Sequence, residues 1–286
     1  MAGERTRAAI AAQPEWLAQV PTGVRLPEGR VAAVGCGTSF HAAQTTGAGH
    51  DALDFLLDPP DADLLVLVSH EGGTPLTVEA AESFAGPRWL VTGKVDSPLG
   101  ALADEVVLAT PALEESYCHT ASYTCAVAAL AALRGEDVSW LPEAVAAALD
   151  GERLPVSAHE RFLVAGAGRD WPTAQEAALK LREGVHVAAE AHRLEELLHG
   201  HLAAVDETVR CLVLEGEGRA AARAAGAVAA LRALGCDVTL VSSRHPVVDI
   251  VPFQLLTVDL AAARGIDPDP IRRDDPRWQA ARDAYA

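Results

Sequence analysis

Short apolar runs rich in Val, Ile and Leu recur along the chain and alternate with Ala-rich stretches of helical character. Uninterrupted apolar runs of this length are typical of strands buried on both faces of a parallel sheet. They predict strands at 30–35, 64–69, 89–92, 105–109, 161–165, 209–214 and 237–241. The intervening stretches predict helices at 40–47, 75–84, 122–134, 142–150, 173–189, 219–234 and 250–264. We therefore expect an α/β fold of parallel sheets flanked by helices, in three α/β/α layers with right-handed crossovers.

One pattern occurs twice. The segments VAAVGCGTSFHAA and FLVAGAGRDWPTAQEAA both run from an apolar strand through a Gly-x-Gly turn and polar residues into a helix. They lie about 130 residues apart, roughly the length of one domain. This repeat predicts two lobes, 1–150 and 151–286, with the boundary in the Pro-containing stretch 151–157. The alternative is one larger sheet with two similar turns.

Composition narrows the class of protein. Half of the 286 residues are apolar, which is enough to bury a core. No apolar run approaches the ~20 residues that span a bilayer, and the N-terminus lacks the pattern of a signal peptide. The five cysteines form no CxxC pair, so we expect a reduced, cytoplasmic protein. A net charge of −17 argues against nucleic acid as a partner but permits a small phosphorylated ligand.

Two polar turns follow predicted strands. The first holds Cys36, Gly37, Thr38 and Ser39, where free amides and hydroxyls favour an anion, although Thr38 or Ser39 could instead cap the helix. It does not complete a dinucleotide fingerprint.

The second turn holds Ser69, His70, Glu71 and Thr74. The carboxyl ends of neighbouring parallel strands form a crevice, so we expect both turns to line a ligand site. Glu71 would repel a phosphate there. His70 either contacts a sugar or is an exposed turn histidine.

Three charged residues, Glu176, Lys180 and Glu183, share one face of a predicted helix because they are spaced at i, i+4 and i+7. They form either a solvated row of ion pairs or a functional site. Apolar neighbours and the scarcity of lysine, which occurs only at 94 and 180, count toward a site.

Downstream, His199 and His201 lie in a segment that we expect to be irregular. An HxH pair without a third ligand is a weak zinc signal, so acid/base chemistry is the better interpretation. A metal-assisted site using His70, Glu71, His199 and His201 is a weaker hypothesis.

The stretch AQEAALKLREGVHVAAEAHRLEELLHG, with the two polar turns, resembles the sugar isomerase (SIS) domain family, in particular the isomerase half of glucosamine-6-phosphate synthase. The resemblance covers most of the chain. It implies that Glu183 is the base that moves a proton between C1 and C2 through an enediol. It also implies that His199 opens the sugar ring in the site of a neighbouring subunit, hence a homodimer. Lys180 and Glu176 would support these residues.

The same resemblance implies substrate contacts, with departures from the family pattern. Glu71 replaces a phosphate-binding serine, and His119 and Ala121 replace a serine and a lysine. The tail lacks the family's lysine, and Arg272 or Arg273 would supply positive charge there instead. The expected substrate-binding residues are Cys36, Gly37, Thr38, Ser39, Ser69, His70, Glu71, Thr74, His119 and Arg272.

We therefore expect a sugar isomerase that acts on a hexose phosphate or an amino-sugar derivative, with no metal and no cofactor. The alternatives are a non-catalytic phosphosugar sensor and a related deaminase or deglycase. The resemblance includes no glutaminase domain, so we expect no glutaminase activity in this chain.

Overall fold

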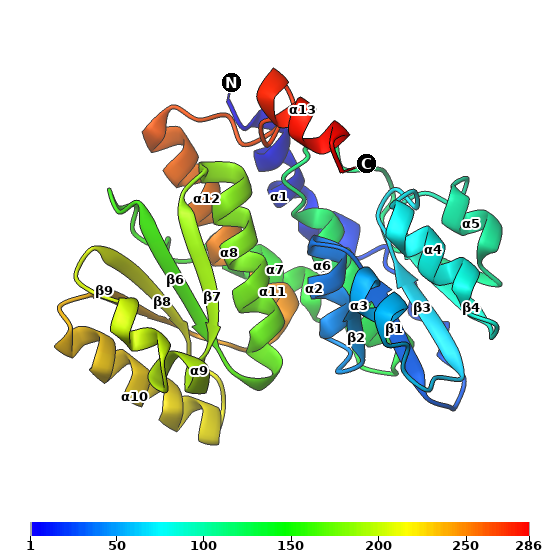
Figure 1. Cartoon of the computed structure of the whole chain (residues 1–286), viewed down its shortest axis with the longest axis horizontal. Coiled ribbons are helices and arrows are strands. Elements are labelled where there is room, and N and C mark those ends of the chain that lie inside the picture. Colours follow the sequence, from blue (N-terminus) through cyan, green and yellow to red (C-terminus); the bar gives the residue numbers. More distant parts are fainter. Residues whose placement is uncertain (1, 286) are drawn as a thin grey trace.

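Two parallel sheets, each flanked by helices, make up the computed structural model, which describes residues 2–285 (Figure 1). The first sheet has the order β2-β1-β3-β4-β5, and the second has the order β7-β6-β8-β9. Every neighbouring pair of strands is parallel. The strands are β1 Val31–Gly35, β2 Gly49–Asp51, β3 Leu64–Val68, β4 Arg88–Thr92, β5 Glu105–Leu108, β6 Arg161–Gly166, β7 Ala188–Arg193, β8 Val209–Leu214 and β9 Asp237–Val241. The predicted α/β class is confirmed.

The helices cover both faces of each sheet, as the apolar strands require. They are α1 Glu4–Leu17, α2 Thr38–Gln44, α3 Ala52–Leu57, α4 Pro75–Ser83, α5 Pro98–Leu102, α6 Ala121–Leu133, α7 Leu141–Leu149, α8 Trp171–Val185, α9 Leu194–Leu198, α10 Arg219–Ala233, α11 Pro246–Asp249, α12 Val251–Arg264 and α13 Pro276–Asp283. The predicted strands match the observed ones to within one residue at each end. The two sheets lie on either side of residues 151–157; the lobe boundary there stays a prediction.

Two local predictions are wrong. The helix expected over 173–189 ends at Val185, because His186 takes the left-handed conformation (φ 61°) and the edge strand β7 starts at Ala188. Edge strands are half-exposed and lack the apolar run on which the prediction relied. The segment around His199, expected to be irregular, begins as the short helix α9 and continues as a 3₁₀ turn at His201–Ala204.

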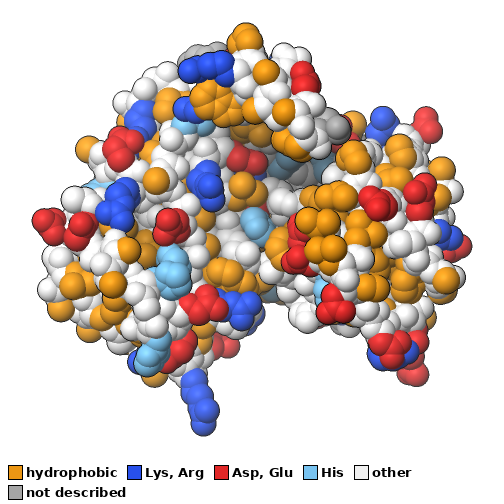
Figure 2. Space-filling view, in the orientation of Figure 1, with side chains coloured by type: hydrophobic (Ala, Val, Ile, Leu, Met, Phe, Trp, Pro, Cys, Tyr) orange, Lys and Arg blue, Asp and Glu red, His pale blue; other side chains and the backbone are white. Residues whose placement is uncertain are grey.

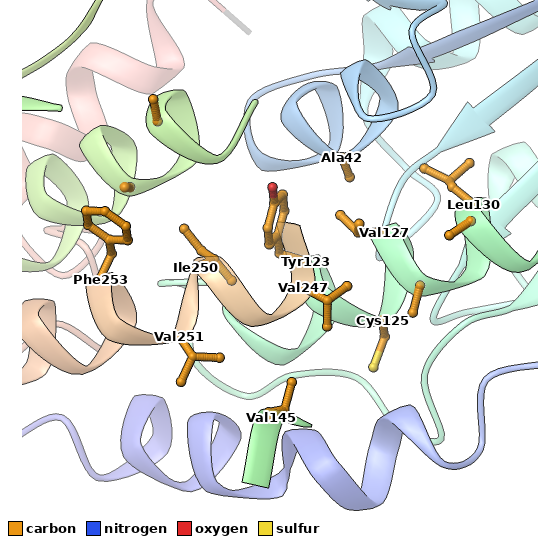
Figure 3. Packing of buried hydrophobic residues seen from close by; sticks show 14 of the residues in the cluster. Ala42, Tyr123, Cys125, Val127, Leu130, Val145, Val247, Ile250, Val251 and Phe253 are labelled. Carbon is orange, nitrogen blue, oxygen red and sulfur yellow. The ribbon is translucent and has the colours of Figure 1, made fainter. Parts of the chain in front are cut away.

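A core shared by both lobes lies around α6 and α12. In Figure 3, Tyr123 of α6 lies on the side of Ile250 and Phe253, whereas Val127 of α6 lies between Ala42 of α2 and Val247 of α11. The same apolar cluster includes strand residues of both sheets, among them Val66 and Val164. The lobes are therefore joined by continuous packing rather than by a mobile linker.

One helical stretch corrects the expectation of no long apolar run. Pro246–Arg264 is long and apolar enough to cross a membrane by length and composition alone. However, 72% of its most apolar window is buried inside the protein, so it serves as a core helix. By contrast, the visible surface carries apolar side chains over α3 and α4, where Leu57 is 73% exposed (Figure 2).

Candidate active site

A buried cluster of charged residues joins the two lobes. The helices α2 and α8, which follow the central strands β1 and β6, pack against one another. On α8, Lys180 Nζ lies 3.3 Å from Glu176 Oε1 and 2.6 Å from Glu183 Oε2. Lys180 also donates to Thr38 Oγ1 on α2 at 3.2 Å. Glu176 is 0% exposed and Lys180 is 1% exposed, so these residues are not a solvated row of ion pairs.

The partners of Glu176 and Lys180 keep both residues charged. Burial alone would raise the pKa of Glu176, but Lys180, His41 and Thr38 hold it below its ordinary value. Burial would likewise lower the pKa of Lys180, but Glu176 and Glu183 raise it above its ordinary value. A charge taken out of water is tolerated only with such partners. The cluster is therefore a network in which removing one member leaves another charge buried and uncompensated.

Glu183 differs from the other two charged residues because its side chain is 24% exposed. It lines a cavity of about 230 Å³, which we name the tail cavity. The cavity is lined by Arg182, Glu183, His186 and Val187 at the end of α8, and by Ile271, Arg272 and Trp278 of the C-terminal segment. Glu183 therefore connects the buried network with a space that a ligand can enter.

The first polar turn contributes to this site from the other lobe. Gly37 (φ 55°) precedes α2 and no side chain caps the helix, so the interpretation of Thr38 or Ser39 as a cap is wrong. Instead, the Thr38 hydroxyl donates to Glu176 at 3.1 Å. Cys36 points elsewhere, with Sγ 3.6 Å from Thr77 Oγ1.

In the second polar turn, Glu71 is exposed to solvent, whereas a hydrogen bond holds His70 in place. Ser69 Oγ and Thr74 Oγ1 lie 3.5 Å apart, and the Glu71 side chain is exposed. His70 accepts a hydrogen bond from the Glu114 backbone N–H at 2.9 Å, so it is not an exposed turn histidine. Burial and the neighbouring His119 lower its pKa to about 4, which keeps the ring neutral. A sugar contact from His70 stays a prediction.

His199 lies on the surface of the second lobe. Its side chain is 70% exposed, and its Nε2 lies 2.7 Å from Glu195 Oε1. Glu195 in turn pairs with Arg223 of α10. Within residues 2–285, no hydrogen bond or ion pair joins His199 to Glu183.

The metal-assisted hypothesis gains no support from the geometry. His70 is bonded to backbone, and the ring of His201 stacks on His192 with centroids 4.3 Å apart. The described part of the chain brings no three His, Cys, Asp or Glu side chains together as a metal site.

The sequence and the fold of this chain were compared with those of known proteins. No protein-family model matches the chain. Two glutamine–fructose-6-phosphate aminotransferases, from Gloeobacter violaceus and Zymomonas mobilis, are 28% and 25% identical to it over 84% of this chain. The chain spans 50% of the length of each.

Solved structures show the same fold. The C-terminal domain of the Francisella tularensis glucosamine-fructose-6-phosphate aminotransferase superposes with a TM-score of 0.76 at 20% identity. That match covers 93% of this chain and 98% of the other. The Thermotoga maritima glucosamine-6-phosphate deaminase superposes with a TM-score of 0.75 at 20% identity. That match covers 93% of this chain and 97% of the deaminase. This chain has the fold of the sugar isomerase domain pair. In sequence it resembles the isomerase half of glucosamine-6-phosphate synthase.

Within this sugar isomerase fold, sequence reasoning missed a second buried network. Glu114 is 8% exposed and accepts hydrogen bonds from the backbone N–H and the hydroxyl of both Thr120 and Ser122. Its carboxylate thereby satisfies the first amides of α6. His119, predicted to contact substrate, lies 3.2 Å from Ser122 Oγ and 3.8 Å from Glu114. His119 therefore borders this network with its side chain 23% exposed.

His41 was missed as well, although a sequence signal exists for it. Its Nδ1 lies 2.7 Å from Glu176 Oε2. His41 follows Thr38 by three residues on α2, so both side chains lie on the face that meets α8. The spacing of three residues could have grouped Thr38 with His41, but only if α2 was already known to pack against α8.

Proposed function

We propose that this protein is a sugar isomerase acting on a hexose phosphate or an amino-sugar derivative. One observation carries the proposal: Glu183 is the carboxylate through which the buried Glu176–Lys180 network meets a cavity. A base for a carbon-bound proton must reach the substrate while its surroundings are held rigid. Glu183 meets both conditions.

The proposed reaction is a proton transfer between neighbouring carbons. Glu183 takes the proton from C2 of the aldose, or from C1 of the ketose, and returns it to the other carbon, while the hydroxyl proton moves from O2 to O1 or back in the reverse direction. Negative charge develops on the oxygens of the intermediate enediol. Lys180, kept charged by its carboxylate partners, lies 2.6 Å from Glu183 and stabilises that charge. Glu176, Thr38 and His41 position Lys180.

Ring opening is assigned to His199, which is exposed and whose Nε2 lies 2.7 Å from Glu195 Oε1. Because no contact joins it to Glu183 within residues 2–285, we propose that it serves the site of a second copy of the chain. A homodimer with shared sites follows from this assignment.

The hydroxyls of Ser39, Ser69 and Thr74 are the proposed contacts for the sugar and its phosphate, whereas the Thr38 hydroxyl is engaged by Glu176 and Lys180. They follow β1 and β3, which are neighbours in the first sheet, so their turns meet at one edge. The exposed Glu71 need not face a ligand bound there. A deaminase or deglycase would use the same proton transfer.

A non-catalytic phosphosugar sensor is the second candidate. The contact of 2.6 Å between Glu183 and Lys180 favours it, because the ammonium engages a carboxylate oxygen that would otherwise accept the proton of the substrate. Substrate must loosen this contact for catalysis, whereas a sensor can keep it.

Isotope exchange separates the two candidates. The protein is incubated in deuterated water with fructose 6-phosphate or glucosamine 6-phosphate, and C1 and C2 are followed by NMR. An isomerase incorporates deuterium, and Glu183→Gln slows this by about 10²–10⁴-fold. The exposed Glu79→Gln serves as the matched control and keeps the wild-type rate. Measurable binding with no exchange for any hexose derivative would overturn the isomerase in favour of the sensor.

A further inference from the structure

The tail cavity has a positive wall formed by two arginines from distant parts of the chain. Arg182 comes from the end of α8 and Arg272 from the segment between α12 and α13. Within residues 2–285, neither guanidinium forms an ion pair with a carboxylate. Lys180 is shared between Glu183 and Glu176, so the buried network itself brings no positive charge to the cavity. The wall therefore presents two guanidinium groups without a carboxylate ion pair among the described residues, in a chain whose net charge is −17.

The Arg272 side of the cavity is held in position. Its guanidinium lies 4.2 Å from the centre of the Trp278 ring, and Arg277 lies 4.8 Å from the same ring. Such stacking restricts the guanidinium and leaves its N–H edge free to donate. Arg272 also takes a left-handed backbone conformation (φ 59°), which non-glycine residues adopt only when their surroundings impose it.

The segment that precedes Arg272 is anchored to α1. The Asp269 carboxylate accepts from the backbone N–H of Thr6 at 2.9 Å and from its hydroxyl at 2.6 Å. The carboxylate of Asp267 accepts from the Gly3 N–H at 2.8 Å. These bonds fix where the tail crosses the end of α8, and α13 lies above this crossing, beside α1 (Figure 1). The arginine therefore belongs to a built wall of the cavity.

From this geometry we propose that the tail cavity binds an anionic group carried by the substrate at its C1–C2 end. The inference rests on the proposed function, because it takes Glu183 as the residue that acts at C1 and C2. An anion held by Arg182 and Arg272 in the cavity that Glu183 lines must be attached close to those carbons. A phosphate on C6 lies at the opposite end of the open chain and belongs to the hydroxyl-rich turns.

The substrate class follows from the chemistry of the wall. A guanidinium fork matches a carboxylate or a phosphate, and paired forks bind either one strongly. Burial and the nearby Arg272 lower the pKa of His186, which therefore faces the cavity as a neutral polar group. Sugars joined through C1 to the nitrogen of a small amino acid carry the required anion, and they keep a C1–C2 pair on which the proposed proton transfer can act.

Direct binding tests the inference without turnover. Calorimetry compares fructosyl-glycine, whose C1 amine carries a carboxylate, with fructosyl-ethanolamine, which has a neutral hydroxyl in its place. The full-length protein is expected to bind fructosyl-glycine about tenfold more tightly, because a charge-assisted hydrogen bond contributes at least that factor. Arg272→Met and Arg182→Met are each expected to abolish the difference. Arg219→Met, at an exposed arginine of α10 that does not line the tail cavity, is the control and keeps it.

Three further results of these measurements would each change the conclusion. Equal affinities for the charged and neutral ligands in the wild-type protein would overturn the inference. Tighter binding of fructose 1-phosphate than of fructosyl-glycine would overturn the amino-acid-linked sugar as the substrate class. Discrimination between the two ligands without deuterium exchange on any sugar would overturn the isomerase while supporting the anion site. Circular dichroism of each variant separates a lost contact from a lost fold.

Discussion

At the scale of single residues, Glu114 shows what a buried carboxylate needs in order to stay ionised. Burial alone would raise its pKa, but His119 and the donors of Ser122 lower it to about 2. The pKa in the folded state is thus below the ordinary 4.5. A group with this sign stabilises the fold above its ordinary pKa, and the contribution is lost as pH falls from 4.5 toward 2.

We expect Glu114→Gln to lower the free energy of unfolding at pH 7 by about 3 kcal/mol, since each pKa unit corresponds to about 1.4 kcal/mol. The difference from wild type should shrink as pH falls below 4.5. Urea unfolding between pH 3 and pH 7 measures both. The neighbouring Glu115→Gln, whose side chain is 81% exposed, is the control and should change stability little. A difference that does not depend on pH would contradict this account.

At the scale of elements, α8 combines catalysis and packing on separate faces. One face carries Glu176, Lys180 and Glu183, while another packs closely against α12. A Cβ at Gly184 would lie 2.5 Å from Thr257 Cγ2 of α12 and 3.3 Å from Pro268 Cβ. The close approach of the two helices therefore requires glycine at this position, although glycine weakens a helix interior.

We expect Gly184→Ala to destabilise the protein by about 1–3 kcal/mol, because overpacking outweighs the better helix propensity of alanine. Adding Thr257→Ser should recover most of the loss. Serine removes the clashing methyl group and keeps the hydroxyl that donates to the Phe253 carbonyl at 2.9 Å. Thermal unfolding of the two single variants and the double variant measures the coupling. A stabilising Gly184→Ala would show that α12 moves aside freely.

At the scale of the whole molecule, the question is whether one chain contains a complete site. The Glu176–Lys180–Glu183 network on α8 is joined to the first lobe of the same chain through Thr38, whereas His199 lies exposed and bonded to Glu195 in the second lobe. The proposed homodimer places His199 beside the Glu183 of its partner. Complementation between inactive variants is the direct test.

We expect Glu183→Gln and His199→Ala to be inactive separately and to recover about a quarter of the wild-type turnover when co-expressed in equal amounts. Half of the dimers are then mixed, and one of their two sites is intact. Glu183→Gln co-expressed with Lys180→Met is the control, because both residues lie in the same chain's part of the site and no intact site forms. Absence of recovery in the first pair would place His199 outside a shared site.

Much of this protein follows from local pattern. Apolar runs are buried wherever a parallel sheet forms, so the strands and the α/β class could be predicted, and helical spacing placed Glu176, Lys180 and Glu183 on one face. The family resemblance supplied the proposed roles of Glu183 and His199. Local pattern failed at β7 and α9, where half-exposed residues carry no clear period.

Only the tertiary structure decided what those residues experience. The spacing of Glu176 and Lys180 is the same on a solvated helix and on a buried one, and the packing of α8 against α2 made it a buried network. The tail cavity unites Arg182 with Arg272, which are far apart in the chain, so no local pattern could reveal it. Sequence by itself determined most of the buried strands and the longer helices, and which side chains share a helix face. Burial, charge compensation and the meeting of distant segments depend on contacts that exist only once the chain has folded.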